Sequence, residues 1–130
     1  MVDSDRRRCQ CEGMTDIDEA EINKAKFLEA FGRFAEGDTD VLFEILREDF
    51  VSHTPGAPAG RDAWIEFIKN SPIASAEIGI EHVIADDQFV VAHYSLTAGE
   101  VREAVVDIWR FEAGLIVEHW SVTELLTPQP

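Results

Sequence analysis

Apolar residues recur at helical spacing through the first half of the chain. Over residues 17–35 they return every three or four positions, which predicts one long amphipathic helix that begins after Asp16 and ends at Glu36-Gly37. A shorter helix is predicted from Asp38 or Thr39 to Leu46, and a third over residues 61–70, before Ser71-Pro72. Between the second and third helices, residues 50–53 are expected to form a short extended segment that leads into a loop rich in proline and glycine over residues 54–60.

After Ala76 the period changes from helical to two. Ile78, Ile80, His82 and Ile84 alternate with other residues, and this alternation predicts a strand. Three more strands are predicted over residues 89–96, 105–111 and 115–120, with turns at Asp86-Asp87, 97–99 and 112–114. Three helices followed by a four-strand meander indicate an α+β domain, a cone-shaped barrel in which a bent antiparallel sheet wraps around the long N-terminal helix.

The composition fits a single compact domain. The chain has 130 residues, of which 45% are hydrophobic, and it has no apolar run long enough to cross a bilayer. Residues 1–14 lack apolar periodicity and are expected to be a disordered leader before a domain over residues 15–130. Cys9 and Cys11 lie in that leader, where two thiols alone cannot complete a metal site. We expect a cytoplasmic protein.

The net charge argues against two classes of partner. With 26 acidic and 11 basic residues the formal charge is −15, and such a field repels both nucleic acid phosphates and anionic membrane surfaces. Nucleic acid and membrane partners are therefore not expected. Of the kinds of binding site considered, a small-molecule pocket is the one that the charge does not argue against.

Alternation along the strands sorts their side chains by face. If His93 shares its face with Phe89, and Asp107 and His119 face the same way on the next two strands, these three polar groups converge in an apolar lining. The opposite faces are also apolar, and we expect a second copy of the chain to cover them. The predicted anchors of this homodimer are Tyr94, Ile108 and Trp120.

Several motifs resemble one known family. They are His53-Thr54-Pro55, Gly60-Arg61, residues 83–87 and 90–94, Val105-Val106-Asp107-Ile108-Trp109-Arg110-Phe111, and Gly114-Leu115-Ile116-Val117-Glu118-His119-Trp120. On these residues the chain, over about residues 17–127, is similar to SnoaL-like polyketide cyclases of the nuclear-transport-factor-2-like superfamily. The resemblance implies enolate chemistry on a small hydrophobic carbonyl compound, as in lyases and isomerases, without a metal or organic cofactor.

The resemblance also implies the site residues. Family members carry an aspartate after the His-Trp pair, whereas this chain has Ser121, which cannot act as a base. Proton abstraction therefore falls to Asp107, His119 or His93. The groups expected to contact the substrate are His53, Ser121, Trp64, Phe31 and Trp109.

Two other interpretations stay open at this stage. His53, His93, His119 and Asp107 have ligand chemistry for a metal, but their wide spacing offers no short ligand motif, so no metal is expected. The serine at 121 also fits a non-catalytic binding or dimerisation domain that has kept the cavity and lost its base.

Overall fold

The computed structural model of the protein describes residues 18–126, so the expected leader lies outside the described residues. The helices and strands follow in the order α1 (Glu19–Ala35), α2 (Val41–Ile45), β1 (Leu46–Ser52), α3 (Arg61–Lys69), the 3-10 helix η2 (Pro72–Ser75), β2 (Glu77–Ala85), β3 (Phe89–Ala98), β4 (Val101–Glu112) and β5 (Leu115–Leu126). The α+β class is confirmed, with three α-helices and one sheet.

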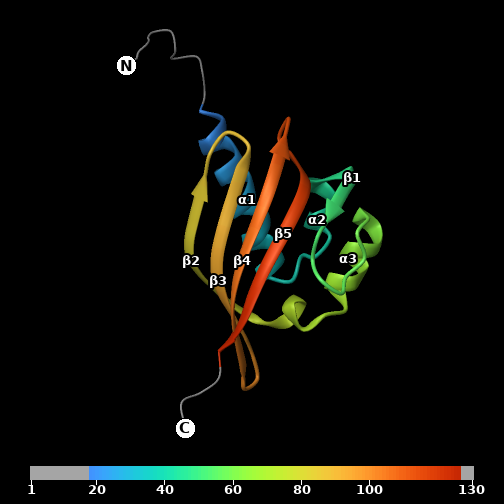
Figure 1. Cartoon of the computed structure of the whole chain (residues 1–130), viewed down its shortest axis with the longest axis vertical. Helices are drawn as coiled ribbons and strands as arrows, with labels where there is room; N and C mark the ends of the chain where they lie inside the picture. The colour runs from blue at the N-terminus through green and yellow to red at the C-terminus, as the bar shows by residue number, and fades with distance from the viewer. Residues whose placement is uncertain (1–17, 127–130) are drawn as a thin grey trace.

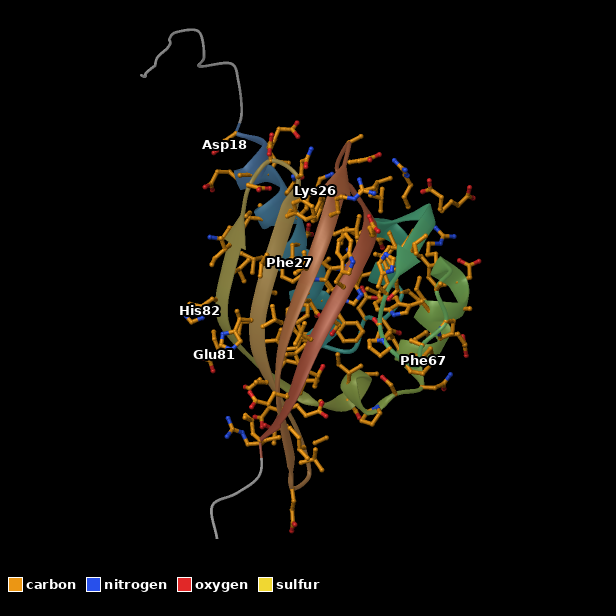
Figure 2. The ribbon with its side chains drawn as sticks, viewed as in Figure 1. Asp18, Lys26, Phe27, Phe67, Glu81 and His82 are labelled. Atoms are coloured by element: carbon orange, nitrogen blue, oxygen red, sulfur yellow. The ribbon has the colours of Figure 1, made fainter. Side chains whose placement is uncertain are left out.

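Helix α1 begins and ends where its sequence provides caps. The Asp18 side chain accepts a hydrogen bond from the amide of Ala20, which satisfies one of the free N–H groups of the first turn. The helix ends before Gly37, whose φ of 102° is readily accessible only to glycine. Phe27, Phe31 and Phe34 form its buried face. Figure 1 shows α1 behind the sheet, and Figure 2 shows Phe27 in that layer.

The sheet has five strands in the order β1-β5-β4-β3-β2, so the predicted four-strand meander is incomplete. The additional strand, β1, pairs in parallel with β5, which lies more than sixty residues further along the chain, and Ser52 pairs with His119. The local periodicity of a sequence cannot predict a pairing between strands so far apart in the chain. The sheet is also not closed, since β1 and β2 form its two edges (Figure 1).

The hairpin between β3 and β4 decides which side chains face the helices. Ala98 pairs with Val101 around a two-residue turn, so Tyr94 pairs with Val105 and His93 with Val106. Paired residues share a face of the sheet. Tyr94 therefore faces the helices with Val105, while His93 faces the opposite way. The prediction that His93 joins Asp107 on the inner face is wrong.

The outer face of the sheet remains uncovered by other described elements. Ile84 and Val122 are each 64% exposed, and Ile108 and Trp120 lie on the same side, where they pair with one another. Tyr94 cannot anchor a dimer there, because it is 2% exposed and faces the helices. Within residues 18–126 no helix has the length and apolar character needed to cross a membrane.

We still expect two copies of the chain to associate through this face, with Ile108 and Trp120 at its centre, because association would remove the apolar patch from water. Sedimentation equilibrium at micromolar concentration is expected to give twice the chain mass of 14.6 kDa. A mass that stays at the monomer value over that range would exclude the association.

Candidate active site

A cavity of about 270 Å³ lies between the helices and the inner face of the sheet. Most of its wall is apolar, and it includes four of the predicted contact residues, Phe31, Trp64, Trp109 and Ser121. The volume is near the lower end of the ~300–1,000 Å³ range typical of small-molecule pockets. A ligand of one or two rings fits this space better than a larger one.

Asp107 is the charged centre of the cavity wall. Its side chain is 6% exposed, and each carboxylate oxygen has one partner. The Tyr94 hydroxyl donates to Oδ2 at 2.6 Å, and Nε2 of His119 lies 3.1 Å from Oδ1. A buried carboxylate needs such partners, because an unpaired charge in an apolar interior is strongly unfavourable. The predicted pairing of Asp107 with His119 is confirmed as geometry.

Hydrogen bonds and ring stacking fix the position of the His119 side chain. Its Nδ1 lies 3.3 Å from the Ser52 hydroxyl and 3.4 Å from the Thr54 hydroxyl, which β1 and the loop after it bring against β5. The ring stacks on Trp109 with a centroid distance of 4.0 Å. Both ring nitrogens therefore have protein partners. With an ionised Asp107, His119 donates from Nε2 and accepts at Nδ1, and it positions the carboxylate.

These hydrogen bonds form one network around Asp107 and His119, and Tyr94 lies at the Asp107 end of it. Burial of the hydroxyl and the negative charge of Asp107 raise the pKa of Tyr94 well above its usual value. Because the folded protein then binds this proton more tightly than the unfolded chain, the stabilisation is complete below pH ~10 and falls as the pH rises above it.

Tyr94 is the single tyrosine of the chain, so its ionisation can be measured without ambiguity. In a spectrophotometric titration of the folded protein, we expect no phenolate absorbance at a pH where free tyrosine is half ionised. Phenolate should appear only as the protein unfolds, which circular dichroism can follow in parallel. Ionisation near pH ~10 in the folded protein would contradict the buried Tyr94–Asp107 bond.

The structure does not bring the other two predicted site histidines, His53 and His93, to the cavity. His93 lies on the outer face, with its Nδ1 3.1 Å from Nδ1 of His82. His53 stacks on Trp120 and bonds to Glu118 at 2.7 Å, outside the cavity lining. That bond, together with Arg110, holds the pKa of Glu118 below its usual value. The predicted placement of His93 and His53 at the cavity is therefore wrong.

Three residues that contact Asp107 or His119, namely Tyr94, Ser52 and Thr54, are not among the predicted site residues. Tyr94 carried a signal, since a two-residue turn at Gly99-Glu100 sets the register that turns it inward. Ser52 carried none, because it reaches His119 only through the parallel pairing of β1 with β5.

The four side chains with metal-ligand chemistry do not come together. Asp107 and His119 meet in the cavity, whereas His53 and His93 lie outside its lining. Among the described residues, no group of three histidine, cysteine, aspartate or glutamate side chains could hold a metal ion.

Solved structures of low sequence identity share this fold. A Kribbella flavida DSM 17836 protein, provisionally named a ketosteroid isomerase, gives a TM-score of 0.74 at 20% identity, covering 87% of this chain and 86% of that one. A steroid delta-isomerase from Pseudomonas aeruginosa gives 0.67 at 23% identity, with 79% and 80% covered. IdmH from Streptomyces antibioticus, provisionally a polyketide cyclase, gives 0.63 at 19% identity, with 78% and 91% covered.

The open sheet, the covering helices and the cavity between them define an α+β fold that this chain shares with these structures. A sequence comparison with curated proteins gives no match. The family model described as the SnoaL-like domain matches residues 25–119. The chain belongs to the SnoaL-like family.

Proposed function

We propose that this protein is an enzyme that removes a proton next to the carbonyl of a small hydrophobic compound and returns it elsewhere, as an isomerase or cyclase-like lyase does, without a cofactor. One observation carries the proposal. A carboxylate, Asp107, lines an apolar cavity and is held there by two polar partners, Tyr94 and His119. A buried base among fixed donors is the arrangement that enolate chemistry needs.

Asp107 acts as the base in this proposal. One of its oxygens accepts the proton from the carbon beside the carbonyl, and the electron pair of that C–H bond forms the enolate. His119 is a poor alternative, because both of its ring nitrogens already have partners in the protein. Return of the proton from Asp107 to another carbon completes an isomerisation with no other reactant.

The enolate oxygen needs a hydrogen-bond donor close to the base. Ser121 pairs with Asp107 across β4 and β5, so its side chain lies beside the carboxylate on the cavity wall. Tyr94 lines the same wall and keeps its proton because of its raised pKa. The Ser121 hydroxyl supplies the donor, since the one proton of the Tyr94 hydroxyl is already donated to Asp107, and Ser121 thus serves the reaction without being its base.

Ser121 also favours a second candidate function, which is ligand binding without catalysis. A cavity whose family aspartate is replaced by Ser121, and whose remaining carboxylate has a partner on each oxygen, also suits a protein that only binds its ligand. Binding without turnover separates this alternative from the enzyme.

The test is the conversion of a bicyclic β,γ-unsaturated ketone into its conjugated isomer, followed by ultraviolet absorbance. We expect the protein to accelerate the conversion above the rate in buffer, and a small planar phenol, which resembles the enolate, to inhibit it competitively. A protein that binds ketone and phenol but leaves the rate unchanged would support the binding function instead.

A further inference from the structure

The buried part and the open part of the cavity differ in their chemistry. The lining residues Phe27, Trp109 and His119 are at most 6% exposed and mark the closed end. Phe67 is 40% exposed and Thr123 is also exposed, although both belong to the same lining. Figure 2 shows Phe67 on α3, at the side of the helical layer. The cavity therefore opens near Phe67 and Thr123.

Glu103 is the charged lining residue at this open end. It is half-buried on β4, where it pairs with Leu96, and two residues further along the strand Val105 pairs with Thr123. Glu103 precedes Asp107 by four positions on the same face, which is roughly 13 Å along an antiparallel strand. A ligand that places its carbonyl near Asp107 can therefore extend its other end toward Glu103.

The Glu103 carboxylate is not neutralised locally. Among residues 18–126 its side chain forms neither an ion pair nor a hydrogen bond, and the net charge of −15 adds to the negative potential at the opening. A carboxylate in a partly desolvated opening attracts cations and hydrogen-bond donors and repels anions. The hydroxyl of Thr123 can assist with a further polar contact.

We propose that Glu103 selects the substrate: the carbonyl compound carries a hydrogen-bond donor, an ammonium or hydroxyl group, at the end remote from its carbonyl, and compounds with an anionic group there are excluded. This inference rests on the proposed function for the position of the carbonyl. Substrates held as anionic conjugates, such as carboxylates or phosphate-bearing thioesters, fall outside the class.

Binding of four matched ligands tests the proposal independently of turnover. The probes are β-tetralones that carry an aminomethyl, hydroxymethyl, methyl or carboxylate group on the ring remote from the carbonyl. Affinity is measured by the change in tryptophan fluorescence, since Trp64 and Trp109 line the cavity. We expect the ammonium or hydroxyl probe, or both, to bind more tightly than the methyl probe, and the carboxylate probe to bind most weakly.

Glu103→Gln is the decisive variant, and Glu124→Gln is its matched control. Glu124 pairs with Ala104 and therefore lies on the outer face of the sheet, but its removal changes the net charge equally. We expect Glu103→Gln to reduce the preference for the ammonium over the carboxylate probe by about tenfold, and Glu124→Gln to leave it nearly unchanged.

Two results would overturn the proposal: equal binding of the carboxylate and ammonium probes to the unmodified protein, or an equal loss of preference in both variants. Turnover of the same tetralones distinguishes failure of the Glu103 proposal from failure of the proposed function. Proton exchange without discrimination between the probes defeats only the role of Glu103, whereas discrimination without exchange defeats only the enzymatic function.

Discussion

Asp107→Asn is expected to lower the rate of ketone isomerisation by about a hundredfold to ten-thousandfold, because the amide has the shape of the carboxylate but cannot accept a proton from carbon. The variant is expected to fold. The amide oxygen can still accept from Tyr94, and the amide N–H can donate to Nε2 of His119 in its other tautomer. Steady-state kinetics and a thermal melt of the same sample measure both effects.

Binding of a planar phenol provides the control for this variant. We expect the affinity for the phenol to change far less than the rate, because the apolar wall and the Ser121 hydroxyl remain in place. An Asp107→Asn protein that is folded, binds the phenol and keeps most of its isomerase rate would remove Asp107 from the mechanism.

Phe50→Ala is expected to cost about 3–5 kcal/mol of the free energy of unfolding, the usual range for truncating a buried phenylalanine. Phe50 is 1% exposed, and its ring contacts both Trp64 and His119, with centroid distances of 5.3 and 6.5 Å. The cavity left by the ring would loosen the wall behind His119. Since domains are stable by only about 5–15 kcal/mol, the loss is large, and urea unfolding followed by circular dichroism measures it.

Phe43→Ala is the matched control for that truncation. Phe43 is 42% exposed and lies under the guanidinium group of Arg61 at 5.4 Å. Its removal is expected to cost about 1 kcal/mol or less. If Phe50→Ala were no more destabilising than Phe43→Ala, the described packing of Phe50 against Trp64 and His119 would be wrong.

Local pattern predicted most of the fold. The long helix was placed to within two residues of Glu19–Ala35, since an apolar stripe and strong end signals coincide there. Only the end of β1, from residue 50, was predicted as extended. Its start was assigned to the preceding helix, because Leu46 continues the apolar pattern of that helix. Its parallel partner is distant in sequence, so only the three-dimensional structure reveals this edge of the sheet.

The site was predicted correctly on two of its strands and wrongly on a third, because the third strand has two similar faces. On β4 and β5 the polar residues Asp107 and His119 mark one face clearly, and that face is the inner one. On β3 both faces are apolar and each carries one polar aromatic residue, His93 or Tyr94. The choice between them depends on the length of the turn at Gly99, and a shift of one residue exchanges the two faces.

In the proposed function, the Asp107 carboxylate takes a proton from carbon inside the cavity. Exchange of the α-hydrogens of β-tetralone with solvent deuterium, followed by proton NMR in heavy water, tests this step most directly because it requires enolisation alone and no particular product. We expect the unmodified protein to accelerate this exchange above the rate in buffer, and Asp107→Asn to abolish the acceleration. An unmodified, folded protein that binds β-tetralone and leaves its exchange rate at the buffer value would show that Asp107 is not such a base.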